Sequence, residues 1–286
     1  MAGVALLLTA PAWSQTAGQP VTIVAAENFY GDVAQQIAGP NVTVTSILSN
    51  PDDDPHLFEA SPSVARAIAD ASIVIENGAD YDPWVEKLLG ASKSASRTTI
   101  NVAELVHKKA GDNPHLWYDP ATMPAFAEAL STRLAAADPA HKAEYDQRLQ
   151  AFVESLKPLE ARIAEMRKKH SATPVTASEP VFGYMATALG LKMRNERFQL
   201  AVMNDTEPSA ADIAAFEKDL KKHRVKLLIY NSQATDESAK RLLDIARQSK
   251  IPVIGVTETE PAGKTYQAWM LDQLNALDDA LSNSGS

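Results

Sequence analysis

Two histidines in the sequence follow a proline and share the same continuation. His56 lies in DDDPHLFE and His115 in NPHLWYDP, so both segments contain Pro-His-Leu followed by an aromatic residue. Proline fixes its own φ angle and restricts the residue before it, which makes the backbone leading into each imidazole stiff. A stiff approach favours a metal-ligand role, and a hydrogen-bonded loop histidine is the alternative. Because the chain has no cysteine, any metal site must use nitrogen and oxygen ligands.

Two glutamates could supply the oxygen ligands. Glu179 follows a predicted strand at 173–177, and Glu258 follows another at 252–257. In open α/β sheets, ligands bind beyond the carboxyl ends of the strands. The alternative for each glutamate is an acid at a helix N-terminus, stabilised by the helix dipole. Two neutral imidazoles and two carboxylates would balance the charge of a divalent cation, and such donors suit Mn, Fe, Zn or Co.

The elements that must position these residues alternate between strand and helix. Segments rich in β-branched and apolar residues predict strands at 21–26, 42–48, 72–77, 98–103, 173–177, 226–231 and 252–257. Helices are predicted at 29–38, from Ser61-Pro62 onward, and at 181–189, 209–222, 236–249 and 264–283. This alternation predicts an α/β fold with two lobes, each a largely parallel sheet flanked by helices.

One long helical segment separates the two halves. Residues 139–170 are strong helix formers without a glycine, and Pro158 should kink this helix or break it locally. We therefore predict an N-terminal α/β lobe over 21–138, a connecting helix over 139–170 and a C-terminal α/β lobe over 171–286. The ligand cleft is expected between the lobes.

The N-terminal segment over 1–20 has a short apolar run followed by small and polar residues. This pattern is typical of a secretory signal, and the run is too short to span a bilayer. A disordered extension is the alternative. We expect the mature chain to be exported and soluble.

Composition and missing signatures exclude several function classes. The net charge of −9 argues against a nucleic-acid partner, which would require a basic surface. The HExxH and GxSxG signatures are absent, and four protein ligands would leave a metal little room for a reactive water, so we expect no enzyme. A metallohydrolase and a receptor for a metal chelate or small organic ligand are the alternatives. Four histidines lie beside lysine or arginine and are expected on the solvated surface: His107, His141, His170 and His223.

The order of the motifs carries a resemblance to a known family. PHLFEASPS, NPHLWYDP, the long helix, SEPVFGYMATALGL, EPSAADI and TETEPAGKTYQAWM follow one another over about residues 21–283. This arrangement resembles the zinc- and manganese-type metal-binding solute-binding proteins of bacterial ABC transporters. The resemblance implies two lobes joined by one rigid helix, with the metal between them. It also implies a periplasmic or otherwise extracytoplasmic receptor, expected to be a monomer, that delivers Mn, Fe or Zn to a membrane permease.

The resemblance assigns a role to each candidate ligand. His56 and His115 match the family's first and second ligands, and Glu179 matches the third, where manganese-type members have Glu and zinc-type members usually have His. The fourth ligand is normally Asp, which the loop VTETEP lacks; Glu258 matches best and Glu260 is the alternative. The His-rich loop that zinc-type members often carry between the first two ligands is missing, so the chain resembles manganese- or iron-type receptors more closely.

Other residues near the motifs are expected to surround the metal rather than bind it. Aromatic side chains close in sequence to the ligands would exclude water from the site. They are Phe58, Trp117, Phe182 and Tyr184. The amides of Asn231 and Gln233, at the end of a predicted strand, could hydrogen-bond a ligand carboxylate.

Overall fold

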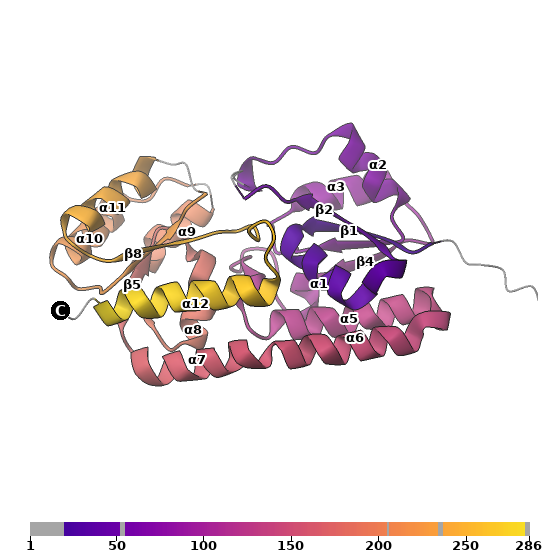
Figure 1. The fold of residues 1–286 in the computed structure, drawn as a ribbon. Helices are drawn as coiled ribbons and strands as arrows, with labels where there is room; N and C mark the ends of the chain where they lie inside the picture. The colour runs from indigo at the N-terminus through magenta and orange to yellow at the C-terminus, as the bar shows by residue number, and fades with distance from the viewer. Residues whose placement is uncertain (1–19, 52–54, 205, 234–236, 284–286) are drawn as a thin grey trace, which may run out of the picture.

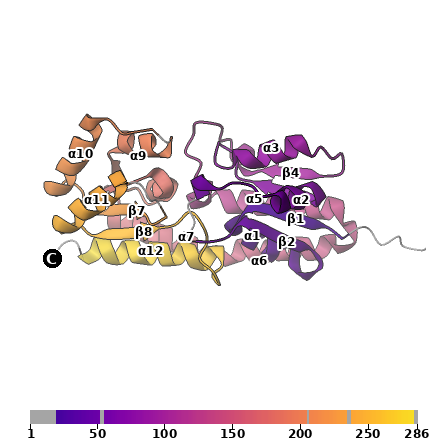
Figure 2. The same cartoon turned by 90° about the horizontal axis from the view of Figure 1, so that it is seen from above.

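The computed structural model describes residues 20–51, 55–204, 206–233 and 237–283. The chain forms two lobes, each built on one four-stranded parallel sheet (Figure 1). The first sheet has the order β2-β1-β3-β4 and the second β6-β5-β7-β8, and the two lie side by side along the molecule (Figure 2). The predicted α/β class with two largely parallel sheets is therefore confirmed.

The first sheet consists of β1 Thr22–Glu27, β2 Thr43–Leu48, β3 Ile73–Glu76 and β4 Thr98–Asn101. Helices cover both of its faces, as an all-parallel sheet requires. Ile23 and Ile75 pack into the main apolar core, whereas Val24 and Val74 point to the opposite face and join a smaller cluster. The elements around it are α1 Asn28–Ala38, η1 Gly39–Asn41, η2 Pro55–Leu57, α2 Pro62–Asp70, α3 Pro83–Ala91, α4 Val102–Leu105, η3 Leu116–Tyr118 and α5 Thr122–Ala137.

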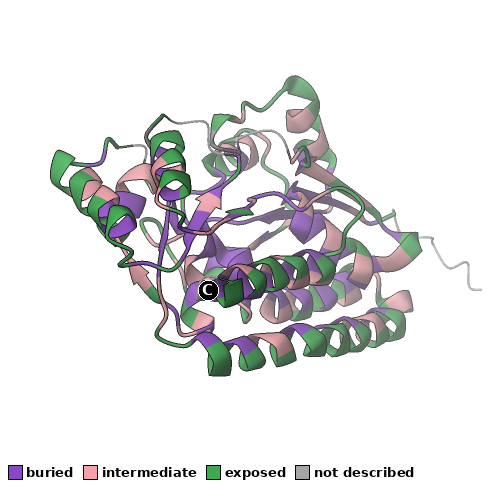
Figure 3. Ribbon diagram, turned by 60° about the vertical axis from the view of Figure 1, so that its left-hand side comes forward, coloured by how far each residue is buried: buried purple, intermediate pink, exposed green. Residues whose placement is uncertain are grey.

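The second sheet consists of β5 Pro174–Ala177, β6 Lys192–Arg194, β7 Leu228–Asn231 and β8 Val253–Val256. Val175 belongs to the same apolar cluster as Ile23 of the first sheet, so one core runs through both lobes. The strands are mainly buried and the outer helix faces are exposed (Figure 3). The elements around this sheet are η5 Pro180–Phe182, α8 Gly183–Ala188, α9 Glu196–Met203, α10 Ala210–Lys221, α11 Glu237–Gln248 and α12 Tyr266–Asn283.

The connection between the lobes is helical. After η4 Pro139–His141, α6 Lys142–Ser155 and α7 Lys157–His170 lie end to end along both lobes (Figure 1). Leu156 separates the two helices, and Pro158 lies in the first turn of α7, where a missing N–H is tolerated. The predicted local break is thus confirmed. The division into domains at residues 138 and 170 stays a prediction. The C-terminal helix α12 packs against the connecting helix α7 and also contacts α1 of the first lobe, so contacts cross both boundaries.

Local capping signals place several helix starts. Ser61 accepts a hydrogen bond from the backbone N–H of Val64, with Pro62 directly after it, as the Ser-Pro signal predicted. Ser209 caps α10 in the same way through the backbone N–H of Asp212. Asn101 caps α4, so the fourth strand ends at residue 101 and not at residue 103 as predicted.

Residues 1–19 of the predicted signal-like segment lie outside the described residues. Across the ranges that the structure describes, no helix combines the length and hydropathy needed to cross a membrane.

The surface assignment of His170 is wrong. This histidine is buried at the end of α7, and its Nε2 lies 2.6 Å from Oδ1 of Asp278 on α12. The prediction assumed that a histidine beside lysines faces solvent. Here Nζ of Lys169 also binds Oδ1 of Asp278, at 2.7 Å, so the acid and the two basic residues form one cluster between the two helices.

Candidate metal centre

His115 is fully buried directly before η3, and its hydrogen bonds define the state of its ring. Its Nδ1 lies 2.7 Å from Oδ1 of Asn113, while Nδ2 of Asn113 donates to the carbonyl of Pro180 at 2.8 Å. The second bond fixes the orientation of the asparagine amide, so Nδ1 of the histidine must carry the proton. In the neutral ring Nε2 then keeps its lone pair, and Nε2 has no hydrogen-bond partner among the described residues. This is the ring state of a metal-binding histidine.

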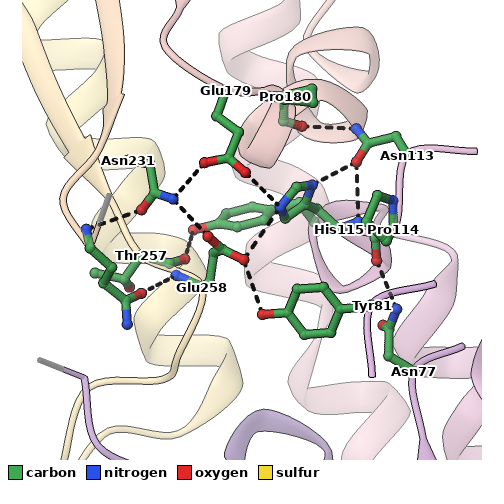
Figure 4. A network of polar contacts seen from close by, with 12 residues as sticks. Asn77, Tyr81, Asn113, Pro114, His115, Glu179, Pro180, Asn231, Thr257 and Glu258 are labelled. Atoms are coloured by element: carbon green, nitrogen blue, oxygen red, sulfur yellow. Dashed lines mark hydrogen bonds and ion pairs between the residues drawn. The ribbon is translucent and has the colours of Figure 1, made fainter. Parts of the chain in front are cut away.

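Two carboxylates face this nitrogen. Oε1 of Glu179 lies 3.9 Å and Oε2 of Glu258 lies 3.4 Å from Nε2 of His115, and all three side chains are buried. One potential ligand atom from each residue lies within 4.8 Å of the others (Figure 4). The fold thus brings together three candidates: His115 from the first lobe, and two glutamates that follow β5 and β8 of the second.

Glu179 stands at a helix N-terminus, as the alternative for this residue expected, and its carboxylate also faces the proposed site. Glu179 precedes η5, but its side chain makes no capping hydrogen bond and turns toward His115 instead (Figure 4). The strand-end rule therefore identifies its position correctly.

One amide links the two carboxylates. Nδ2 of Asn231, the last residue of β7, donates to Oε2 of Glu179 at 2.8 Å and to Oε1 of Glu258 at 2.6 Å. Its own Oδ1 accepts from the backbone N–H of Gln233 at 3.1 Å, which fixes the amide orientation. The prediction for Asn231 is confirmed. Gln233 instead accepts from the backbone N–H of Glu258 and so helps to hold that loop.

Tyr81 and Asn113 contribute to the site, although the sequence analysis did not identify either. The hydroxyl of Tyr81 donates to Oε2 of Glu258 at 3.0 Å. Burial, followed by the negative charge of Glu258, raises the pKa of Tyr81 well above its ordinary value, so the phenol remains a donor. Tyr81 follows the carboxyl end of β3, so the strand-end rule could have found it; Asn113 lies two residues before a proposed ligand.

Glu260 lies outside this cluster. Asn28 binds its main chain from both sides: Oδ1 accepts from the N–H of Glu260 at 2.9 Å, and Nδ2 donates to its carbonyl at 2.7 Å. Burial, followed by the negative charge of Asp32, raises the pKa of the Glu260 carboxyl to about 9. Of the two glutamates in the loop, Glu258 is therefore the one that faces His115.

The backbone of His56 lies in η2, between β2 and α2, and its side chain lies outside the described residues. Its participation stays a prediction.

Of the four aromatic residues expected around the cluster, Trp117, Phe182 and Tyr184 contact it or its neighbours, whereas the ring contact of Phe58 lies elsewhere. Trp117 is buried with its ring centroid 5.4 Å from that of His115, and Phe182 is buried against Tyr118. Tyr184 donates its hydroxyl to the carbonyl of Asn113 at 2.7 Å. Phe58 packs on Trp84, with the ring centroids 4.8 Å apart.

Comparisons with known proteins agree with this architecture. Residues 23–280 match the ZnuA family, described as the zinc-uptake complex component A, periplasmic. The metal ABC transporter substrate-binding lipoprotein ScbA of Streptococcus cristatus is 24% identical over 293 residues, which cover 94% of this chain and 91% of that protein. The manganese ABC transporter substrate-binding lipoprotein PsaA of Streptococcus anginosus is 23% identical over 291 residues, covering 93% and 91%.

A solved structure shares the fold. The periplasmic zinc-binding protein TroA of Treponema pallidum superimposes with a TM-score of 0.76 at 20% identity, covering 92% of this chain and 99% of that one. Because the family match extends over nearly all described residues of both lobes, the chain belongs to the ZnuA family of substrate-binding proteins of metal ABC transporters, which are not enzymes.

Proposed function

We propose that this chain is the extracytoplasmic component of an ABC transporter that captures a divalent transition-metal cation, Mn, Fe or Zn, and delivers it to a membrane permease. Family membership supports the role, and the names of PsaA and TroA associate similar proteins with manganese and zinc. The observation that carries the proposal is the buried cluster of His115, Glu179 and Glu258.

The chemistry of this cluster fits a divalent cation. Nε2 of His115 has a free lone pair directed at two carboxylates, which together carry two negative charges if both are ionised. Two carboxylates so close in a buried site repel each other, and a divalent cation offsets both charges. We propose that His115, Glu179 and Glu258 are ligands, with His56 as the fourth. This assignment takes Glu258, rather than Glu260, as the residue that replaces the family's usual Asp.

The ligand set also bears on which metal is carried. Three or four nitrogen and oxygen donors, with Glu179 in place of a third imidazole, suit Mn²⁺ and Fe²⁺ as well as Zn²⁺. Affinity at such sites generally increases from Mn²⁺ to Zn²⁺, so the purified protein should bind Zn²⁺ more tightly even if the transported ion is manganese or iron. In the cell, metal availability and the geometry of the metal-bound site would decide which ion is transported.

Capture and release follow from the positions of the ligands. The neutral imidazole of His115 comes from the first lobe, and both carboxylates come from loops of the second. A small displacement of one lobe would separate Nε2 from both carboxylates together. We propose that docking on the permease produces this displacement and releases the ion.

A competitive titration tests the ligand assignment. Demetallated wild type, Glu258→Gln and Glu260→Gln are titrated with Zn²⁺ and Mn²⁺ against a chromophoric chelator. Both substitutions replace one carboxyl group with an amide and keep the side-chain shape, so they form a matched pair. Loss of the Glu258 charge should weaken binding at least about tenfold, because outer partners of metal ligands already account for about 10–100-fold, whereas Glu260→Gln should stay near wild type. A loss confined to Glu260→Gln would transfer the ligand role to that residue. A wild type that binds neither ion below about micromolar would favour a receptor for an organic ligand.

A further inference from the structure

A second pair of acids is buried in the first lobe, outside the cluster that faces His115. Glu27 ends β1 and Asp82 lies just before α3, and their exposed fractions are 0% and 2%. Neither carboxyl oxygen of Glu27 has a hydrogen-bond partner among the described residues. The two acids are neighbours, because β1 pairs with β3 as far as Ala25 and Ile75, two residues before Glu27 and Asn77, and Asn77 binds Asp82. Two carboxyl groups can hydrogen-bond to each other only if one of them carries a proton.

The proton belongs on Glu27 because Asp82 already accepts two backbone hydrogen bonds. Oδ2 of Asp82 accepts from the N–H of Asn77 at 2.7 Å, and Oδ1 accepts from the N–H of Gly78 at 2.8 Å. These bonds stabilise the ionised form of Asp82. Burial, followed by the negative charge of Asp82, raises the pKa of Glu27 well above its ordinary value; burial also raises the pKa of Asp82, to about 6, against the effect of its backbone bonds.

The segment that Asp82 closes is a strained turn. Gly78, Ala79 and Asp80 have φ angles of 74°, 52° and 65°, so three consecutive residues adopt the left-handed conformation and two of them are not glycine. This conformation is unfavourable for residues with a Cβ atom, and it persists only where the surroundings hold it. The two backbone bonds to Asp82 provide that hold at the start of the turn.

Both ends of this turn reach the proposed metal centre. Nδ2 of Asn77 donates to the carbonyl of Pro114, the residue before His115, at 2.9 Å. Tyr30 fixes this amide by donating to Oδ1 of Asn77 at 2.8 Å. At the other end, Tyr81 donates to Glu258 at 3.0 Å. The turn thus touches the backbone of one proposed ligand and the carboxylate of another (Figure 4).

We propose that Glu27 is a positioning residue that keeps its proton in the folded protein and donates it to Asp82, so that the pair holds the turn at 77–82 against the metal centre. The proposal rests on the function proposed above. A second metal is a weaker explanation for these acids: among the described residues, only His115, Glu179 and Glu258 form a group with metal-ligand spacing. A proton, not a cation, therefore reconciles Glu27 with Asp82.

Two substitutions of Glu27 separate its donor role from its charge. Glu27→Gln keeps a donor for Asp82 and should bind Zn²⁺ within about twofold of wild type, because a protonated glutamic acid and a glutamine are both neutral donors. Glu27→Leu fills similar space without a donor and should weaken Zn²⁺ binding at least about tenfold, as the loss of outer partners does at other metal sites. Rescue by glutamine distinguishes positioning from simple packing.

Infrared spectroscopy supplies a readout that does not require metal. The difference spectrum between metal-free wild type and Glu27→Gln at pH 7 should show the carbonyl band of one protonated carboxyl in the wild type. Absence of that band would mean an ionised Glu27 and would overturn the proposal. A Glu27→Gln variant that loses Zn²⁺ affinity tenfold would also overturn it, because a neutral donor would then not replace Glu27. Wild-type affinity in a folded Glu27→Leu would overturn it as well.

If Glu27→Leu does not fold, the infrared band and the Zn²⁺ affinity of Glu27→Gln decide. Failure of all variants, wild type included, to bind Zn²⁺ would instead refute the proposed function and leave the band as the test of the proton.

Discussion

Asn231 should control metal affinity although we do not propose it as a ligand. Its single amide nitrogen donates to both Glu179 and Glu258, at 2.8 and 2.6 Å, and holds their other oxygens toward His115. Asn231→Ala removes both bonds. A hydrogen bond to a charged group contributes about 1.5–3 kcal/mol, and outer partners of metal ligands typically account for about 10–100-fold in affinity. We expect a loss of this size, which corresponds to about 1.4–2.7 kcal/mol.

Thermal or chemical denaturation at a fixed metal concentration reports this loss directly. At a free Zn²⁺ concentration of about 100 times the wild-type Kd, binding stabilises the wild type by about 2.7 kcal/mol. The same concentration should stabilise Asn231→Ala by only about 1.4 kcal/mol if the affinity falls tenfold, and by about 0.4 kcal/mol if it falls 100-fold. Isothermal competition with a chelator measures the two dissociation constants independently.

Asn275→Ala is the matched control. Asn275 lies on α12 and its Oδ1 accepts a bond from Arg162 at an exposed position, so the same truncation occurs far from the cluster. This control should keep wild-type affinity. If Asn231→Ala also binds Zn²⁺ as the wild type does, then the amide does not position the carboxylates and the reasoning from the hydrogen bonds is refuted.

Two further predictions concern the dependence of stability on pH. Burial alone would raise the pKa of Asp278, but hydrogen bonds from His170, Lys169 and Arg162 hold it well below its ordinary value. A depressed pKa stabilises the fold above the unfolded value and loses this effect as pH falls, so Asp278→Asn should lower Tm at pH 7 and progressively less below about pH 4. An equal drop at pH 7 and pH 2 would contradict this. For Glu76, burial followed by the charge of Asp82 raises the pKa to about 7 from 4.5. Stability should therefore fall as pH rises between these values, and Glu76→Gln should raise Tm at pH 8 but not at pH 4, as calorimetry would show.

Much of the fold was predictable because its signals are local. Runs of β-branched residues and Ser-Pro or Ser-x-x-Asp starts depend only on neighbouring residues, and they placed Glu179 and Glu258 at strand ends. The short strand β6 and the helix α9 were not predicted because KMRNERFQL contains no apolar run, and the start signal of Asn195 and Glu196 was too short to indicate a helix alone. His170 was misplaced because its partner, Asp278, lies more than a hundred residues away in sequence.

The surroundings of the site were harder to predict than its ligands. Pro-His motifs and strand ends identify ligand types from spacing alone. Tyr81 contributes only because a left-handed turn carries it to a carboxylate of the other lobe. Asn113 similarly joins His115 to the carbonyl of Pro180, across the two lobes. Such contacts depend on how the lobes pack, which no local pattern records.

The most direct test of the central claim is anomalous diffraction from crystals grown with Mn²⁺ or Zn²⁺. We predict one strong anomalous peak between the lobes, within about 2.0–2.3 Å of Nε2 of His115 and of carboxylate oxygens of Glu179 and Glu258. A fourth contact to His56 would complete the proposed set. A peak that is bound elsewhere, or coordinated by Glu260 in place of Glu258, would contradict the account.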